Sequence, residues 1–206
     1  LPVGWKQQDL TKNENAKWLC DSIEVFTKQK KEYNYNELIN YWKEKGWLQK
    51  ILKNGSITIT GGEPFLYQKS LVKFLNKLHN EYGQHIFIEV ETNTTIKPTD
   101  DFDIEINQFT CSPKLSNSGM INERRYKKDV LNWYVKTHKS IFKFVIANDE
   151  DLKEVEDSFI QPFNIPLNKI WLMPACSNKN ELQLLQKWLA EICIEKGYNY
   201  SNRLQI

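Results

Sequence analysis

The chain has 206 residues, of which 40% are hydrophobic and 26% are charged. This length and composition are typical of one globular domain and exclude a disordered chain. The 28 basic and 26 acidic residues nearly balance, so the charge gives no reason to expect a nucleic-acid partner. No apolar run approaches the ~18 residues of a transmembrane helix, so no membrane partner is expected.

The cysteines indicate a reducing compartment. The chain has four of them, Cys20, Cys111, Cys176 and Cys193, with no Cys-x-x-Cys pair. Such wide spacing in a chain of this size argues against a disulfide framework. The first residues also lack the layout of a signal peptide. We therefore expect a cytoplasmic protein.

Segments with strand-like and helical periodicity alternate along the chain. In chain order they predict a helix at 35–53, a strand at 56–60, a helix at 67–82, strands at 85–92 and 102–112, a helix at 122–137, a strand at 140–147, a helix at 149–160, a strand at 169–174, a helix at 179–196 and a last strand that includes 203–206. This order predicts an α/β fold with a mainly parallel sheet and right-handed crossovers. Cys193 lies on the apolar stripe of the last helix and is expected in the core.

Polar residues gather where the predicted strands end. Thr60-Gly61-Gly62-Glu63-Pro64 closes the first strand, and its glycine pair would let the backbone approach a ligand. The carboxyl ends of parallel strands meet at one edge, where α/β proteins bind their ligands. Each segment alone could be a turn or a helix cap, whereas their joint occurrence favours one ligand site. The other segments are Glu91-Thr92-Asn93, Cys111-Ser112-Pro113-Lys114, Lys143-Phe144-Val145-Ile146 and Met173-Pro174-Ala175-Cys176.

Leu19-Cys20-Asp21-Ser22 precedes the first long helical pattern. A lone cysteine is usually a buried apolar side chain, and aspartate or serine beside it is usually a helix cap. A thiolate is also the ligand of iron–sulfur clusters, and oxygen ligands suit magnesium. The residues alone leave both interpretations open.

The order of these motifs resembles the 7-carboxy-7-deazaguanine synthase family, which are radical S-adenosyl-L-methionine (SAM) lyases of queuosine and 7-deazaguanine biosynthesis. The resemblance runs from near Trp18 to the end, including the final Arg203-Leu204-Gln205. Gly-Gly-Glu-Pro alone indicates only the radical SAM superfamily. Glu-Thr-Asn together with Ser-Pro-Lys-Leu-Ser is more specific for this family.

The resemblance implies one domain over residues 1–206, folded as an incomplete (β/α) barrel of radical SAM type with the site inside its open rim. It implies a 4Fe–4S cluster, SAM bound to the cluster, and Mg²⁺. The substrate would be 6-carboxy-5,6,7,8-tetrahydropterin, which is converted to 7-carboxy-7-deazaguanine with release of ammonia. A homodimer and a flavodoxin-like or other electron donor are also implied.

The resemblance also suggests roles for individual residues, although it assigns no catalytic residue. Cys20 matches a cluster ligand and Ser22 a magnesium ligand, with Leu19 and Asp21 beside the cluster and SAM. Thr60 matches a substrate contact. The residues that match SAM contacts are Gly62, Ser112, Pro113, Lys114, Met173, Pro174, Ala175 and Cys176. The family often has glutamine where this chain has Met173.

The chain departs from the family in its first residues. The family's Cys-x-x-x-Cys-x-x-Cys spacing would place its other cysteines at Asn13 and Lys17, and a second alignment would place one at Val3. We therefore expect the family's first strand and part of its cluster loop to lie outside this sequence, or the cluster to be altered. The alternatives are a glycyl-radical activating enzyme, which shares Gly-Gly-Glu-Pro, and a cluster-free relative that binds a pterin or a protein partner.

Overall fold

The structure, a computed structural model, describes residues 32–83, 86–204 and 206. Its centre is a six-stranded parallel sheet in which the strands lie side by side in chain order, β1 to β6. This order means that each crossover advances in the same direction, as in a barrel that does not close. The strands are β1 (Ser56–Ile59), β2 (Phe87–Thr92), β3 (Gln108–Cys111), β4 (Ser140–Ile146), β5 (Ile170–Pro174) and β6 (Asn199–Tyr200).

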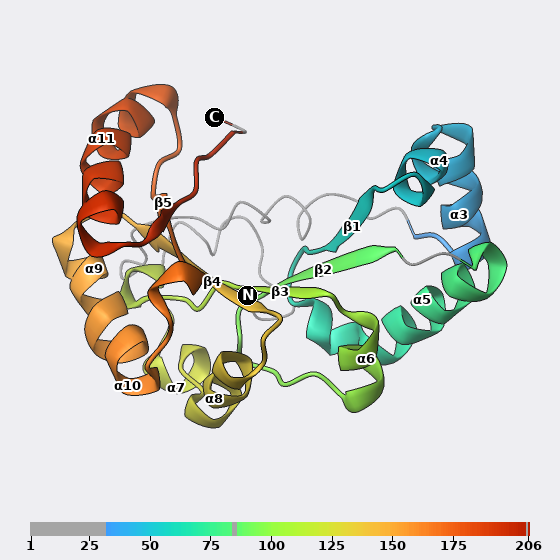
Figure 1. Cartoon of the computed structure of the whole chain (residues 1–206), viewed down its shortest axis with the longest axis horizontal. Coiled ribbons are helices and arrows are strands. Elements are labelled where there is room, and N and C mark those ends of the chain that lie inside the picture. Colours follow the sequence, from blue (N-terminus) through green and yellow to red (C-terminus); the bar gives the residue numbers. More distant parts are fainter. Residues whose placement is uncertain (1–31, 84–85, 205) are drawn as a thin grey trace.

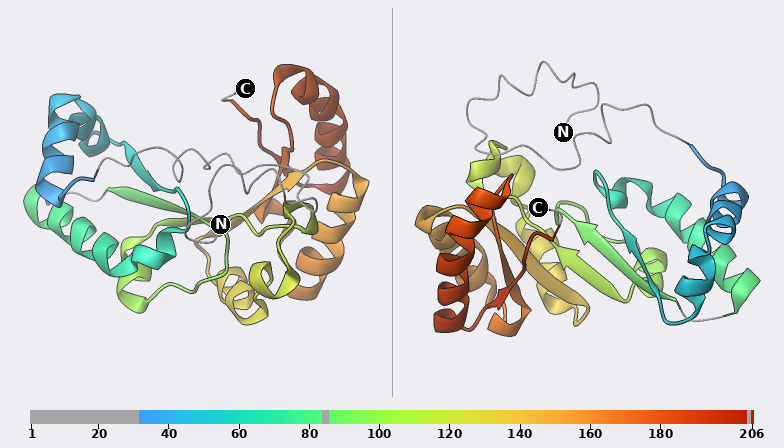
Figure 2. Two further views of the ribbon diagram at one scale, coloured as in Figure 1. Left: turned by 180° about the vertical axis from the view of Figure 1, so that it is seen from behind. Right: turned by 90° about the horizontal axis from the view of Figure 1, so that it is seen from above.

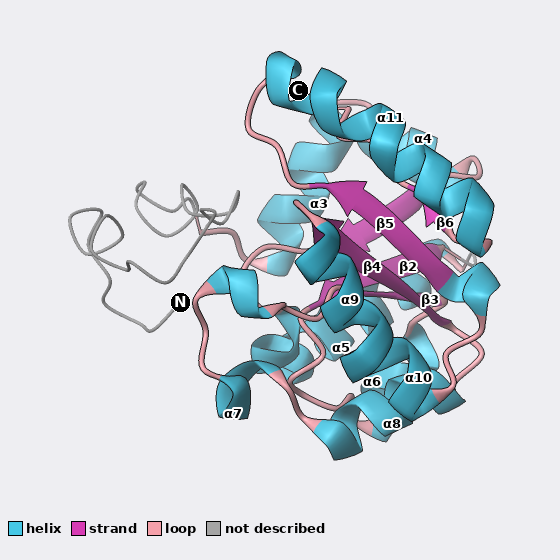
Figure 3. Cartoon of the chain, turned by 90° about the vertical axis from the view of Figure 1, so that its left-hand side faces the viewer, coloured by secondary structure: helices cyan, strands magenta, loops and turns pink. Residues whose placement is uncertain are grey.

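The helices follow the outer, convex side of this curved sheet (Figures 1 and 2). Figure 3 shows α8 to α11 covering the sheet from outside. The helical elements are α3 (Tyr35–Glu44), α4 (Trp47–Leu52), η1 (Pro64–Tyr67), α5 (Gln68–Tyr82), α6 (Asp100–Glu105), η2 (Ser116–Ser118), α7 (Asn122–Arg125), α8 (Lys128–Lys136), α9 (Asp149–Val155), the π-helical turn η3 (Glu156–Ile160), α10 (Gln161–Phe163), η4 (Leu167–Lys169) and α11 (Lys179–Lys196). None of the described helices is both long enough and apolar enough to cross a membrane.

The two faces of the sheet differ in polarity. In β2, Ile88 and Val90 are fully buried toward the helices, whereas Glu89 and Glu91 alternate with them on the concave face. Lys143 likewise lies between the buried residues Phe142 and Phe144 of β4. A parallel sheet is normally covered on both faces. A concave face with carboxylates and a lysine is therefore suited to a polar ligand.

An aromatic cluster packs the helical layer beneath the strand ends. Phe65 of η1 lies 5.4 Å from Phe102 and 6.1 Å from Tyr134, measured between ring centroids, and both contacts are edge-to-face. The buried Tyr134 hydroxyl donates to the carbonyl of Ile96 at 2.9 Å. This packing fixes η1 against the sheet, and with it the turn that precedes η1.

The expected fold class is confirmed, and several boundaries were wrong. Residues 102–112 were expected to form one strand, but α6 occupies Asp100–Glu105 and β3 begins only at Gln108. Asp100, Asp101 and Asp103 lie in the first turn of α6, where carboxylates stabilise a helix. Among the described residues the last strand is β6, and Arg203, Leu204 and Ile206 lie in no strand, so the strand expected to include 203–206 was wrong at these positions.

Two expected helices are interrupted. The helix expected at 35–53 ends before Gly46, whose φ of +66° lies in the left-handed region, and α4 starts afresh after it. The helix expected at 122–137 is divided at Tyr126 and Lys127, both of which have extended backbone. The helix expected at 179–196 is confirmed as α11.

Candidate functional site

A glycine turn begins the site at the carboxyl end of β1. Gly61 has φ of +127°, a conformation that side chains disfavour. A Cβ atom built on Gly61 would meet no described residue within 4 Å, so the described part of the chain leaves open space beside this turn. Glu63 then caps η1 by accepting from the Phe65 N–H at 3.2 Å, and Pro64 occupies the first position of η1.

Glu63 ties this turn to the end of β2. Its carboxylate also accepts from the Thr92 hydroxyl at 2.9 Å and from the Asn93 N–H at 2.9 Å. Burial raises the pKa of Glu63, while its hydrogen bonds from Asn93, Thr92 and Phe65 and the positive charge of Lys114 only partly oppose that rise. The sequence motif marked this glutamate, but its role as a brace between two strand ends appears only in the structure.

The turn after β2 is held in an unusual conformation. Thr94 is fully buried and has φ of +63°, which is rare for a β-branched residue. Its N–H donates to the Thr92 hydroxyl at 3.1 Å, and its hydroxyl donates to the Asn93 carbonyl at 2.6 Å. The Asn93 side chain in turn accepts from the Thr95 N–H at 3.0 Å. Asn93 thus caps this turn, and sequence reasoning missed Thr94.

Glu91 lies on the concave face between two partners. It accepts from the Thr60 hydroxyl at 2.8 Å and pairs with Lys143 at 2.9 Å. Burial raises the pKa of Glu91, but the hydrogen bonds from Lys143 and Thr60 and the charges of Lys143 and Lys114 outweigh burial and hold this pKa below its usual value. An ionised carboxylate here can accept hydrogen bonds from ligand hydroxyl or amino groups.

The segment 112–114 reaches the same edge after β3. The Ser112 N–H donates to the Thr92 carbonyl at 2.7 Å. The charge of Lys114 acts on both Glu63 and Glu91, so the structure brings the three predicted segments Thr60–Gly62, Glu91–Asn93 and Ser112–Lys114 together. A cavity of about 10 Å³ lies beside Ser112–Leu115, Asn117 and Val145. It is large enough only for about one water molecule, so a larger ligand would lie over the rim.

The segment Met173–Cys176 ends β5 at the same edge. Met173 pairs in register with Val145, and the Ala175 N–H donates to the Ile146 carbonyl at 2.8 Å. Pro174 and Cys176 are buried, and the Cys176 thiol lies 3.7 Å from the Pro174 carbonyl oxygen. A ligand at the rim could therefore contact the main chain of this segment, or Met173 and Ala175, more readily than the Cys176 side chain.

The described cysteines do not fit an iron–sulfur cluster. Cys111, Cys176 and Cys193 are buried, and the described residues contain no group of three or more His, Cys, Asp or Glu that could hold a metal ion. Burial raises the pKa of the Cys111 thiol, and it raises that of Cys193 to about 11. Both shifts disfavour the thiolate that binds iron. The predicted ligands Cys20 and Ser22, with Leu19 and Asp21, lie outside the described residues.

The rim offers several groups that could bind a polar ligand. Gly61 leaves open space beside the turn, Lys114 supplies a positive charge, and Glu91 supplies an ionised acceptor beside it. The Thr60 and Ser112 segments flank these groups from the neighbouring strand ends. A nucleoside with hydroxyl groups and a charged amino-acid tail matches such a set of hydrogen-bonding groups.

Comparison with known proteins identifies the relatives of this chain. No protein-family model matches it. Proteins named 7-carboxy-7-deazaguanine synthase from Pyrobaculum aerophilum and Rhodopirellula baltica are 30% and 28% identical to it, over 74% and 80% of this chain. A protein of the same name from Halobacterium salinarum is 28% identical over 73% of this chain. The chain is a relative of the 7-carboxy-7-deazaguanine synthases.

The alignments cover only part of these synthases. The chain spans 64%, 69% and 63% of the lengths of the Pyrobaculum, Rhodopirellula and Halobacterium proteins. The crystal structure of QueE from Escherichia coli superposes with a TM-score of 0.55 and covers 98% of this chain and 80% of that chain. At 18% identity this match shows the fold. Together with the strand order it confirms the expected incomplete (β/α) barrel with a mainly parallel sheet.

Proposed function

We propose that this chain is a radical SAM lyase that converts 6-carboxy-5,6,7,8-tetrahydropterin to 7-carboxy-7-deazaguanine with release of ammonia. The observation that carries the proposal is the convergence of Thr60–Gly62, Glu91 and Lys114 at one rim of the sheet. The names of the relatives support the choice of reaction.

The chain's own residues would bind and orient the reactants at this rim. We assign the main chain at Gly62, the Ser112–Lys114 segment and the Met173–Cys176 segment to SAM, and Thr60 to the pterin. Glu91 and Lys143 form a half-buried ion pair beside Thr60, so a polar ring on the concave face would meet both charges. SAM, when bound to a reduced cluster, supplies the radical that removes a hydrogen atom from carbon 6 of the pterin.

The metal assignments rest on resemblance. Cys20 is our proposed cluster ligand, with Leu19 and Asp21 beside the cluster and SAM, and Ser22 is our proposed magnesium ligand. A hydroxyl oxygen suits magnesium and does not suit cluster iron. We further propose a cytoplasmic homodimer served by a flavodoxin-like or other electron donor. Cys111 and Cys193 form no disulfide among the described residues, which is consistent with a reducing compartment.

Anaerobic reconstitution of the full chain with iron and sulfide would test the proposal. Incubation with SAM, a chemical reductant, magnesium and 6-carboxytetrahydropterin should give 7-carboxy-7-deazaguanine, detected by mass spectrometry. Lys114→Met should reduce the affinity for SAM. Formation of 5′-deoxyadenosine without the deazaguanine would contradict the proposed substrate. Absence of iron binding would instead favour a cluster-free relative.

A further inference from the structure

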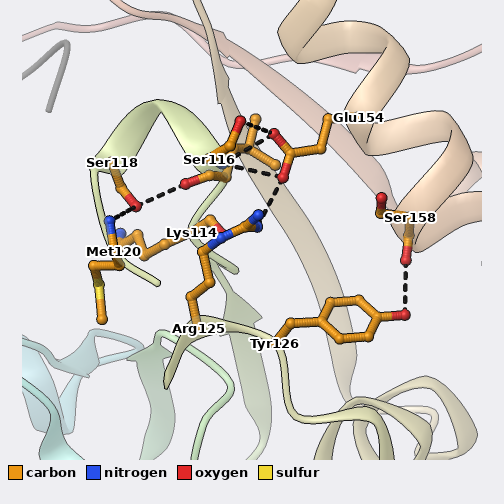
Figure 4. Close-up of polar contacts among 9 residues, drawn as sticks. Lys114, Ser116, Ser118, Met120, Arg125, Tyr126, Glu154 and Ser158 are labelled. Atoms are coloured by element: carbon orange, nitrogen blue, oxygen red, sulfur yellow. Dashed lines mark hydrogen bonds and ion pairs between the residues drawn. The ribbon is translucent and has the colours of Figure 1, made fainter. Parts of the chain in front are cut away.

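The segment that carries Ser112 and Lys114 is held by a largely buried ion pair between two helices further along the chain. The loop after β3 runs to η2, and two helices further along the chain contact it: α7 provides Arg125, and α9 provides Glu154 (Figure 4). Arg125 Nη1 lies 2.7 Å from Glu154 Oε1. The same nitrogen donates to the Lys114 carbonyl at 3.1 Å.

Glu154 binds the same loop two residues later, at Ser116. Its carboxylate accepts from the Ser116 N–H at 3.0 and 2.9 Å and also from the Ser116 hydroxyl. Arg125 and Glu154 therefore fix the backbone on both sides of Leu115, whose side chain is buried. Figure 4 shows the two side chains meeting beneath this loop. Neither partner needs to touch a ligand to determine where the Lys114 side chain starts.

The Arg125–Glu154 ion pair itself contributes little to the stability of the fold. Arg125 is the buried residue of α7, and its Nε has no hydrogen-bond partner among the described residues. A buried ion pair with an unsatisfied nitrogen is a weak source of stability, because removing charges from water costs about as much as their attraction returns. What the pair does provide is one defined position for the loop backbone.

We propose that Arg125 and Glu154 are positioning residues for the SAM site, which they serve by fixing the Ser112–Lys114 segment at the rim. This inference rests on the proposed function. It adds residues of α7 and α9 to the rim residues that determine the affinity for SAM.

Arg125→Met provides the main test. Its effect on the dissociation constant of SAM is measured on the anaerobically reconstituted chain by equilibrium dialysis, and amide hydrogen exchange reports on the loop. We expect affinity to fall about tenfold, because a misplaced binding group loses most of its contribution. We also expect the Ser116 amide to lose protection. Arg125→Lys should recover part of the affinity, since a lysine ammonium has three donors and Nη1 alone makes both contacts.

Lys139→Met is the matched control. Lys139 also bridges a carboxylate and a carbonyl, those of Asp103, at 3.0 and 2.6 Å. It lies beside the amino end of β4, away from the rim. We expect a small loss of stability, because this pair is more exposed, and unchanged affinity for SAM, because the two positions share no partner.

The outcomes separate this inference from the proposed function. If Lys114→Met weakens SAM binding and Arg125→Met does not, the positioning inference is wrong while the proposed function stands. If the wild type has no affinity for SAM, both are wrong. If Arg125→Met does not fold, Glu154→Gln tests the same loop, and an affinity and a Ser116 protection equal to those of the wild type would overturn the inference.

Discussion

At the scale of single residues, Glu63 joins two strand ends at the candidate site. It is a buried carboxylate that accepts hydrogen bonds from Phe65, Thr92 and Asn93. A glutamine would place an amide N–H₂ group against at least one of these donors. Glu63→Gln should therefore cost about 1–3 kcal/mol in the free energy of unfolding, as expected for an unsatisfied buried group.

The pH dependence of that loss follows from the raised pKa of Glu63. When the folded-state pKa of an acid is raised, the linked stability is present below the unfolded pKa and is lost as pH rises through the folded pKa. The difference in unfolding free energy between wild type and Glu63→Gln, measured by urea unfolding at several pH values, should thus narrow as pH rises above 4.5, the ordinary pKa of a glutamate. Glu181→Gln is the control with the opposite slope, because bonds from Ser177 and Asn178 lower the pKa of Glu181.

Lys143 is a residue whose removal should affect binding more than folding. Its pair with Glu91 is partly exposed, so Lys143→Met should cost at most about 1 kcal/mol of stability. Affinity for the pterin substrate should fall severalfold, because Glu91 would lose its main ionic partner beside Thr60. Equilibrium binding of the pterin and chemical unfolding of the same protein separate the two effects. A large stability loss with unchanged binding would show that Lys143 is only structural.

At the scale of secondary-structure elements, Cys193 packs one helix against a strand and has no expected role in ligand binding. It lies on α11, is 4% exposed, and its thiol approaches the Asn199 carbonyl of β6 at 3.6 Å. This contact joins the last helix to the last strand. Cys193→Ala should lower the free energy of unfolding by about 1–2 kcal/mol through a small cavity. Iron content after reconstitution should equal that of the wild type, whereas a loss of iron would make Cys193 a cluster ligand.

The elements also show which predictions a sequence supports. The periodic patterns of α11, β2 and β4 predicted these elements almost to the residue, because each has one buried face. The first part of the strand expected at 102–112 was wrong, because the aspartates in the first turn of α6 stabilise a helix there. The break at Gly46 and the turn at Thr94 depend on left-handed backbone, which local periodicity does not report.

At the scale of the whole molecule, the glycine turn and Ser112–Lys114 were predictable as parts of one site because parallel strands bring their carboxyl ends together. The Glu63 brace and the Arg125–Glu154 pair were not, since each joins segments far apart in the sequence whose meeting depends on the finished fold. Local patterns thus predicted which segments meet at the rim, and they did not predict what holds these segments in place.

Ligand binding at the polar concave face would change the stability of the whole molecule. A ligand that binds only the folded state stabilises it by mass action, by about 2.7 kcal/mol at a hundred times its dissociation constant. SAM should therefore raise the melting temperature of the reconstituted chain in a concentration-dependent way. Cys193→Ala should have a lower melting temperature without SAM and show the same increase on adding SAM, because its core position is separate from the rim. Lys114→Met should start near the wild-type melting temperature and respond weakly, because its positive charge beside Glu63 and Glu91 is gone. Equal responses in all three proteins would mean that SAM, if it binds, does so away from this rim.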